Sequence, residues 1–416
     1  MFRRLSFALI VLTFGFCSLV PFVACGEQGE SPAEAKTDAD KPGEKEQPSA
    51  QSVLETTFAR GMKWLTTRQL MDGSWPDPQG KADVAFTAMA VKAIAEAPES
   101  VKKEYSANME KGVKYILGCI QDGGKIVDAG KIPTLANYKT GLSLMALVAV
   151  DREKYAEQIL KARRYLEQTQ FCESYMDVKP DSKAYGGWGY DEKTQTANPD
   201  LSNSSMTIAA LKSAGLPEDS EVWKRAVKFL ERVQNRSESN DVPPAIREQD
   251  VVPLNDGGFY YRPDESKGGP VTRPDGKKAY KSYGSMTYLG LMSFIYSFVK
   301  KDDPRVAGAY DWIRDNFTFE ENPGLRTDAD PNLGKQGLFY YYHTFAKALD
   351  AYGEAEIVTI DNVKHRWADE LVAYLAEVQQ KDGSWSNTAS RWWEDDPGLC
   401  TSYVLMTLNI ARKWAK

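Results

Sequence analysis

Histidine and cysteine are scarce in this chain of 416 residues. It has two histidines, His343 and His365, and five cysteines. Two histidines cannot build a histidine-rich metal site. Three cysteines, Cys119, Cys172 and Cys400, remain once those near the N-terminus are set aside, and an odd, widely spaced set is not a disulfide framework. The sequence therefore predicts no metal, no cofactor and small buried thiols.

An excess of positive charge is also missing. The formal net charge is −6 and the sequence pI is about 5.4. Binding to nucleic acid needs a basic surface that neutralises phosphates. No RNA- or DNA-binding motif is present either, so we expect no nucleic-acid partner.

The first 25 residues form a separate segment. A positive start is followed by an apolar run that ends in a small residue, which is the layout of an export signal. The letters FVAC at 22–25 resemble the lipobox of bacterial lipoproteins, although Phe22 replaces the usual Leu. The resemblance implies lipidation of Cys25 and a membrane-anchored protein that faces the periplasm or the cell surface. Plain secretion and an uncleaved anchor remain alternatives.

A polar stretch follows the export signal. It is rich in Glu, Lys, Pro, Ala and Ser and has almost no large apolar residues. Such a segment cannot bury enough apolar surface to order itself. We expect residues 26–55 to be a disordered tether and residues 56–416 to form the folded domain.

The domain contains a six-fold internal repeat. An aromatic residue followed by an aliphatic one marks an amphipathic helix, and a small residue followed by an aliphatic one marks an apolar helix after it. The amphipathic helices are marked at Trp64, Tyr115, Tyr165, Phe229, Trp312 and Tyr374. The apolar helices are marked at Ala93, Ala146, Ala210, Gly290, Ala348 and Thr407. The pattern predicts six hairpins, each with an outer and an inner helix.

The spacing of these markers indicates where the function lies. The outer-to-inner connections vary widely in length, with a long insertion at about 235–282, whereas the inner-to-outer connections are short. The long loops should therefore share one end of the molecule, which is the candidate functional face. The first and last repeats match each other best, and that favours a closed ring over an open stack with polar caps.

Two nearly identical segments carry a family resemblance. QLMDGSW at 69–75 and QQKDGSW at 379–385 resemble the QW motif of squalene–hopene cyclases. The Gly-Gly-aromatic loops within 185–205 and 256–261, and the segment 283–294, are similar to those of the same superfamily, which includes protein prenyltransferases. The resemblance implies an all-α fold over the domain, an (α/α)6 toroid with inner helices around a central cavity.

The motif has a structural interpretation in its first copy, and the second copy is interpreted in the same way. Gln69 can satisfy free carbonyls at the end of its outer helix. Gly73 permits a tight turn. Trp75 can then pack in the wall between hairpins, although contact with a ligand is an alternative.

The catalytic motifs of the family are not matched. Its cyclases use an Asp-x-Asp-Asp run as an acid, whereas this chain has Asp328-x-Asp330 before a proline and the pair Asp395-Asp396. No Asp-Asp-x-x-Asp run is available for magnesium diphosphate. In prenyltransferases a histidine similar to His343 binds zinc, but the matching aspartate and cysteine are not found, and one ligand cannot hold zinc.

Aromatic residues and a few carboxylates remain as site candidates. The aromatic side chains expected at the mouth of the long loops are Trp188, Tyr190, Tyr260, Tyr261, Tyr283, Tyr288, Tyr340, Tyr341, Tyr342, Trp392 and Trp393. Together with His343 they would line a cavity for an apolar or isoprenoid-like molecule, although each one alone could equally fill the core. Asp83 and Asp200 are expected to cap inner helices. Asp200 and Asp396 are the candidates for a catalytic carboxylate.

The sequence leaves three functions open. The first is a lipid-anchored toroid that binds an apolar or isoprenoid-like ligand without turning it over. The second is a diverged terpene cyclase or prenyltransferase. The third is a toroid that binds or cleaves polysaccharide, since other toroids of this kind cleave sugars with paired carboxylates. A protein-binding scaffold is a weaker fourth option.

Overall fold

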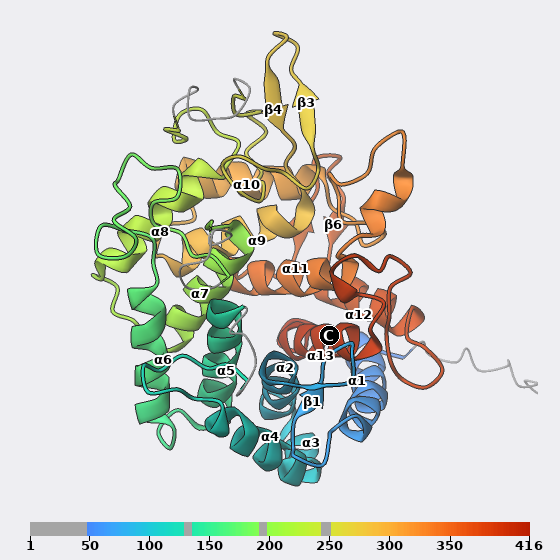
Figure 1. Cartoon of the computed structure of the whole chain (residues 1–416). Helices are drawn as coiled ribbons and strands as arrows, with labels where there is room; N and C mark the ends of the chain where they lie inside the picture. The colour runs from blue at the N-terminus through green and yellow to red at the C-terminus, as the bar shows by residue number, and fades with distance from the viewer. Residues whose placement is uncertain (1–47, 129–134, 191–197, 243–250) are drawn as a thin grey trace, which may run out of the picture. The chain divides into compact units, whose positions relative to one another are not determined.

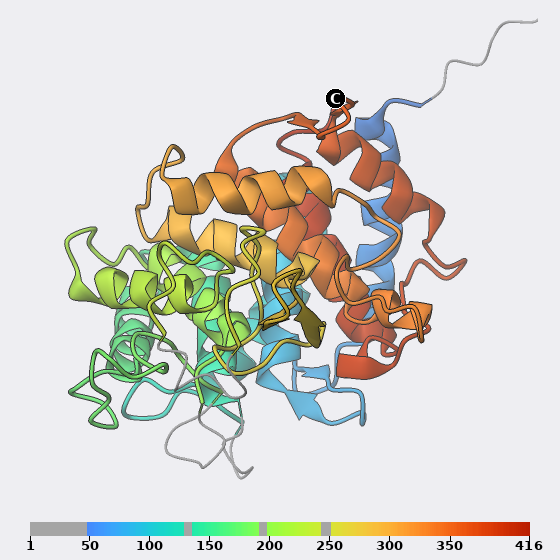
Figure 2. The same ribbon diagram turned by 90° about the horizontal axis from the view of Figure 1, so that it is seen from above.

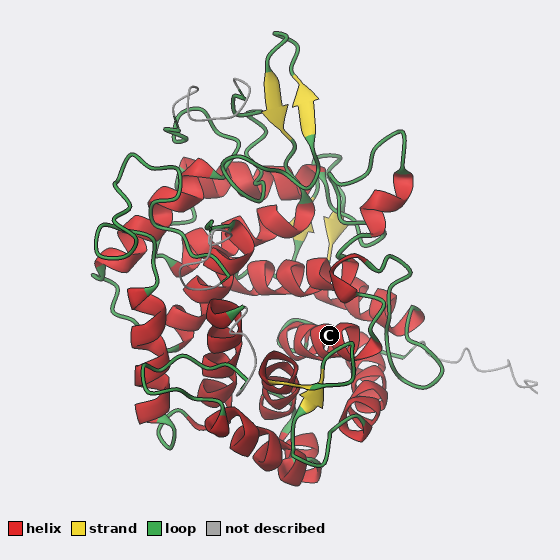
Figure 3. Cartoon of the chain, viewed as in Figure 1, coloured by secondary structure: helices red, strands yellow, loops and turns green. Residues whose placement is uncertain are grey.

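The computed structural model describes residues 48–416 apart from 129–134, 191–197 and 243–250. Most of the described residues are helical (Figure 3). Residues 48–416 form one compact unit. The expected export signal, Cys25 and most of the expected tether lie outside the described residues.

Six helical hairpins make up this unit. Their outer helices are α1 (Ala50–Thr67), α4 (Ser106–Gly118), α6 (Ala156–Gln168), α8 (Glu221–Arg232), α10 (Pro304–Asp315) and α12 (Trp367–Glu377). Their inner helices are α2 (Val84–Ala95), α5 (Ala136–Asp151), α7 (Leu201–Ser213), α9 (Gly284–Tyr296), α11 (Leu338–Tyr352) and α13 (Pro397–Ala411). The outer and inner sets agree with the predicted repeat.

The inner helices form a closed ring. Each contacts the next in the order α2, α5, α7, α9, α11 and α13, and α13 contacts α2. The first outer helix, α1, contacts both helices of the last hairpin, α12 and α13. Figures 1 and 2 both show the blue start of this unit beside its red end. The predicted (α/α)6 toroid is confirmed.

Hydrogen bonds join the first hairpin to the last. Gln379 Nε2 donates to the Thr57 carbonyl at 3.0 Å, and Asn409 Nδ2 donates to the Ala93 carbonyl at 2.9 Å. The Arg412 guanidinium lies 3.3 Å from the Glu55 carboxylate. These contacts explain why the first and last repeats have matching motifs: each faces a neighbour within the wall.

Burial follows the predicted division between the two sets of helices. The outer helix α8 buries one face, which includes Trp223, Phe229 and Leu230, and exposes its charged face. The inner helix α9 is buried over nearly its whole length, from Gly284 to Phe294. An inner helix packs against neighbours on most sides and therefore has no polar stripe.

Short elements decorate the ring. They are α3 (Glu99–Glu104), the 3-10 helices η3 (Pro331–Lys335) and η4 (Arg391–Trp393), and the antiparallel pairs β1 (Trp75–Pro76) with β2 (Ala82–Asp83), β3 (Pro270–Thr272) with β4 (Lys278–Tyr280), and β5 (Ile357–Val358) with β6 (Lys364–His365). The β3–β4 hairpin belongs to the predicted long insertion and projects from the ring in Figure 1. Within the described part of the chain, no helix is long and apolar enough to span a membrane.

The boundary of the folded domain differs from the prediction. Helix α1 begins at Ala50, inside the segment 26–55 that was assigned to the tether. Ser49 caps the helix, because its hydroxyl accepts a hydrogen bond from the Ser52 amide at 3.2 Å. The first turn of α1 lacks an apolar pattern, so the sequence does not indicate that these residues are helical.

Candidate functional site

The long loops begin with turns that glutamine side chains fix in place. Gln69 Nε2 donates to the carbonyls of Gly73 and Asn108, each at 2.9 Å. The predicted bond to the end of its own helix is wrong; the amide instead ties the turn to the next outer helix. Equivalent pairs of bonds run from Gln170 to Gly186 and Val222, from Gln234 to Gly257 and Arg305, and from Gln379 to Gly383 and Thr57.

Glycine and tryptophan complete the motif in the wall. Gly73 has φ +90°, and a Cβ there would lie 2.6 Å from the Lys111 carbonyl oxygen. Trp75 is buried and its Nε1 donates to the Leu65 carbonyl at 2.8 Å. Trp385 is fully buried in the same arrangement at the seam between the last and first hairpins. Both tryptophans are wall residues, as predicted, although Trp75 also borders a pocket described below.

A hydroxyl on the inner helix holds each of five loops at the mouth. The Trp75 backbone N–H donates to Thr87 Oγ1 at 2.9 Å. The same bond joins Ile126 to Thr140, Trp188 to Ser204, Phe259 to Thr287, and Trp385 to Thr401. The long loops are therefore fixed to the starts of the inner helices, at one end of the ring.

Aspartates that precede these Thr and Ser residues in the sequence cap inner helices. Asp83 accepts from the Ala85 amide, and Asp200 accepts from the Asn203 amide at 2.9 Å. Asp396 accepts from the Leu399 amide at 2.8 Å at the start of α13. The predicted capping roles of Asp83 and Asp200 are confirmed.

Tyrosine side chains meet across the axis of the ring at this end. Tyr138 on α5 and Tyr403 on α13 bring their hydroxyls to 3.4 Å, and Tyr340 on α11 bonds Ser202 on α7 at 2.8 Å. Neither pair of helices is adjacent in the ring. The rings of Tyr340 and Tyr403 are 5.6 Å apart, so the four side chains form a continuous layer. We call this layer the tyrosine floor; Tyr138 and Tyr340 are partly exposed in it.

A buried carboxyl lies beside this floor. Asp200 is 1% exposed, and both of its oxygens accept hydrogen bonds from Asn203. Burial raises the pKa of Asp200 to about 6, and the Asn203 bonds oppose the rise. Tyr190 and Tyr261 approach it with hydroxyls 3.3 Å from each other, and burial with the nearby Asp200 charge raises the pKa of Tyr190 to about 12. The phenols are uncharged at neutral pH, whereas the Asp200 carboxyl, with a pKa of about 6, is mostly ionised there, so the site disfavours an anionic ligand.

Four of the residues expected to line the cavity lie in the wall instead. Trp188 is fully buried and its Nε1 donates to the Leu166 carbonyl. Tyr260 is buried and its hydroxyl donates to the Arg232 carbonyl. Tyr288 and Tyr341 are fully buried and pack edge to face, 5.6 Å apart. These side chains fill the space between hairpins and do not face the mouth.

The remaining predicted residues differ in their exposure. Tyr190 is 36% exposed, and Tyr283 is buried at the start of α9. Trp392 is exposed on the rim. His343 is buried against the Tyr403 ring at 5.7 Å, and burial lowers its pKa well below the usual value. Among the described residues, no group of three or more His, Cys, Asp and Glu side chains is placed to hold a metal.

Sequence reasoning missed Tyr138, Tyr403 and Glu394. Glu394 is buried, and its carboxylate accepts from the Tyr340 amide at 2.7 Å and from the Asn387 side chain at 2.8 Å. It thereby caps α11 from another hairpin, and burial raises its pKa to about 7. Tyr138 and Tyr403 could have been found from the sequence, since both lie in the first half of a predicted inner helix, near the mouth. Glu394 could not be found in this way, because three acidic residues follow one another at 394–396 and the sequence does not show which of their carboxylates turns inward.

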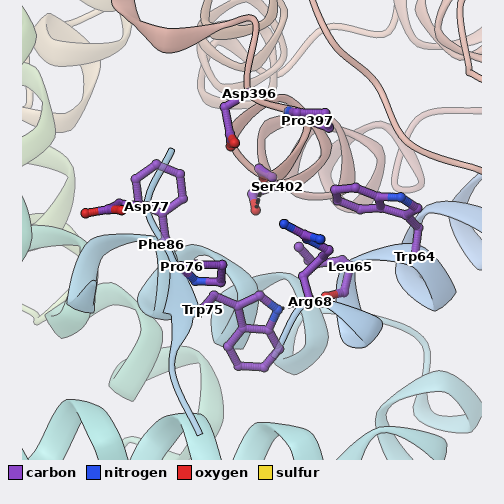
Figure 4. Close-up of a pocket in the computed structure, with 11 residues that line it drawn as sticks. Trp64, Leu65, Arg68, Trp75, Pro76, Asp77, Phe86, Asp396, Pro397 and Ser402 are labelled. Atoms are coloured by element: carbon purple, nitrogen blue, oxygen red, sulfur yellow. Dashed lines mark hydrogen bonds between the residues drawn. The ribbon is translucent and has the colours of Figure 1, made fainter. Parts of the chain in front are cut away.

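The two candidate catalytic carboxylates lie apart. Asp200 caps α7 and Asp396 caps α13, and these inner helices are not neighbours in the ring. Asp396 faces a pocket of about 150 Å³ between the last and first hairpins (Figure 4). Arg68, Phe86 and Ser402 also line it.

Comparison with known proteins supports the fold and nothing finer. No family model matches the chain, and no curated protein does. Type II terpene cyclase MstE from Scytonema is 13% identical, with a TM-score of 0.54 over 88% of this chain and 99% of that one. A family 76 glycoside hydrolase from a bovine Bacteroides thetaiotaomicron strain is 11% identical, with a TM-score of 0.52 over 87% and 78%. A D-mannose isomerase is 10% identical, with a TM-score of 0.53 over 88% and 99%. These proteins share the α/α toroid, and at such low identity they show the fold alone.

Proposed function

We propose that this toroid binds an apolar or isoprenoid-like small molecule above the tyrosine floor and does not turn it over. The observation that carries the proposal is the gathering of partly exposed tyrosines from several hairpins around the buried Asp200 carboxyl. Aromatic faces bind apolar chains, and the hydroxyls offer a few directed hydrogen bonds to a polar end.

The toroid neighbours are consistent with this ligand class. The MstE structures include a complex with geranylgeranyl dihydroxybenzoate, described as the substrate, and one with merosterolic acid A, described as the product. The ligand would lie at the mouth here, because the tyrosine floor crosses the axis at the starts of the inner helices. We also propose that the chain belongs to the terpenoid cyclase and prenyltransferase superfamily, and the toroid fold that it shares with MstE supports this assignment.

Native mass spectrometry of residues 48–416 purified from the native host tests the proposal. We expect a co-purifying isoprenoid or other lipid of defined mass that is lost in a Tyr190→Ala/Tyr340→Ala double variant. Tyr185→Ala is the control, since Tyr185 is a partly buried tyrosine whose hydroxyl bonds Glu173 away from the floor. Turnover of squalene or a prenyl diphosphate by the purified protein would refute binding without chemistry.

A second candidate is acid-catalysed cyclisation of an isoprenoid. The observation in its favour is the raised pKa of Asp200, since a protonated carboxyl beside aromatic rings can donate a proton to an alkene. In this case Asp200→Asn should abolish product formation while helicity stays unchanged, because Asn caps a helix as well as Asp. Gas chromatography of products from the wild type and the variant decides between the two functions.

We further propose export and lipid anchoring through Cys25. The support is the apolar N-terminal run and the FVAC segment. Mass spectrometry of the mature N-terminus should find a diacylglyceryl group on Cys25, and Cys25→Ser should release the protein from the membrane fraction. A free N-terminus further along the chain would contradict anchoring.

A further inference from the structure

The pocket between the last and first hairpins lies outside the tyrosine-lined mouth. The end of α1 contributes Trp64 and Arg68, α2 contributes Phe86, and the start of α13 contributes Asp396 and Ser402. In Figure 4 the Arg68, Asp396 and Ser402 side chains converge on its centre, with Trp64 and Phe86 to either side. The ring closure therefore creates a site that no single hairpin contains.

The charged groups of this pocket face one another without pairing. Among the residues that the structure describes, the Arg68 guanidinium contacts no carboxylate and lies 5.7 Å from the centre of the Trp64 ring. Burial raises the pKa of Asp396, and the Arg68 charge partly opposes that rise. Asp396 Oδ1 accepts from the Leu399 amide, and the Gly398 amide also donates to the Asp396 carboxyl. A bound molecule that bridges the two groups would satisfy both.

The chemistry of the pocket selects its ligand. Arg68 can only donate hydrogen bonds and an ionised Asp396 can only accept them, whereas a hydroxyl does both. The Asp396 carboxylate disfavours an anion, and Arg68 disfavours a cation. A cavity of about 150 Å³ accommodates a single six-membered ring. These properties fit one neutral pyranose with its apolar face against an aromatic wall.

A second observation concerns the loop that leads to Asp396. Trp392 and Trp393 are 42% and 53% exposed, and both have left-handed backbone angles, φ 59° and 63°. The loop is held by the buried Glu394, and the Asp396 amide donates to the Trp393 carbonyl at 3.0 Å. Strained residues persist where surrounding contacts enforce them, and they cluster at ligand-binding sites. The two exposed indoles belong to the same connection between α12 and α13 as Asp396 and offer stacking surfaces for further sugar units.

We propose that this pocket binds one pyranose unit of a neutral glycan, with Trp392 and Trp393 extending the binding surface. The site is independent of the apolar ligand proposed for the mouth. The proposed role is binding without catalysis. The pocket contains only one of the two candidate catalytic carboxylates, since Asp200 caps α7 on another part of the ring.

Saturation-transfer NMR and calorimetry on the full chain test the proposal. The probes are glucose, mannose and galactose, each alone and in unbranched trisaccharides. We expect at least one probe to bind, and Arg68→Met and Asp396→Asn each to weaken it about ten-fold or more, as the loss of a charged hydrogen bond implies. Lys63→Met removes a neighbouring positive charge on α1 outside the pocket and should leave the affinity unchanged.

Several results would overturn the inference. They are the absence of binding by every probe, equal affinities for the wild type and Arg68→Met, or tighter binding of a zwitterionic amino acid such as glycine or alanine. The Tyr190→Ala/Tyr340→Ala variant should still bind the sugar, which separates this site from the mouth. Circular dichroism checks that each variant is folded.

Discussion

At the scale of single residues, a buried charge cluster joins the first two hairpins. Lys139 Nζ lies 2.8 Å from Asp83 and 2.5 Å from Asp128, and the Tyr115 hydroxyl donates to Asp128 at 3.0 Å. All three charged side chains are nearly inaccessible to solvent. The cluster is satisfied internally and so serves the wall, not a ligand.

Lys139→Met should therefore destabilise the fold strongly. It leaves two carboxylates buried without a counter-charge, which costs about 3–5 kcal/mol. Urea denaturation followed by circular dichroism measures the change. Lys161→Met is the matched control, because Lys161 pairs with Glu157 on the surface, where solvent screens the pair and its loss should change stability little. Equal effects of the two variants would contradict this account.

Glycine at the seam provides a second residue-scale prediction. Gly383 has φ +99°, and a Cβ there would lie 2.6 Å from the Arg60 carbonyl oxygen. Gly383→Ala should cost about 3 kcal/mol, from the left-handed backbone and the clash with the first hairpin. Gly80 has φ +77°, but no atom lies within 4 Å of a Cβ added there. Gly80→Ala should therefore lower the free energy of unfolding by only about 1 kcal/mol. A Gly383→Ala effect no larger than that of Gly80→Ala would show that the seam is open in solution.

At the scale of elements, the sequence predicted the hairpins well and the site poorly. The two periodic markers located every outer and inner helix, because amphipathic and apolar helices differ in composition over many residues. Tyr340, Tyr341 and Tyr342 show the limit. Successive residues on a helix point about 100° apart, so one faces the mouth while the other two enter the wall. Composition alone does not reveal which of the three this is.

The capped inner helices carry a pH-dependent prediction. The pKa of Asp200 is raised from 3.8 to about 6 by burial, so between these pH values the folded state binds a proton that the unfolded state has released. The free energy of unfolding must then fall as pH rises through this window. Glu394, with its pKa raised to about 7, acts in the same direction.

Asp200→Asn isolates this contribution. The variant keeps the helix cap, and its loss of stability between pH 4 and pH 7 should be smaller than that of the wild type by about 2 kcal/mol. Asp200→Ala should also lose about 1 kcal/mol at all pH values, because the cap is gone. Thermal unfolding across this pH range provides the measurement, and identical pH profiles for the wild type and Asp200→Asn would contradict the raised pKa.

At the scale of the whole molecule, closure of the ring organises both proposed sites. It brings tyrosines of three inner helices, α5, α11 and α13, together with Ser202 of α7 at one end, and it places Arg68 of the first hairpin opposite Asp396 of the last. The sequence predicted closure from the likeness of the terminal repeats. It could not predict the seam pocket, because that pocket depends on the side-chain directions of two segments more than 300 residues apart.

Photo-crosslinking measures the central claim most directly. A geranylgeraniol analogue with a diazirine near its hydroxyl is incubated with the protein, irradiated and mapped by peptide mass spectrometry. The account predicts labels on the peptides that contain Tyr138, Tyr190, Tyr261 and Tyr340, with competition by unmodified geranylgeraniol. Labels confined to other surfaces, or no competable label, would contradict a ligand site above the tyrosine floor.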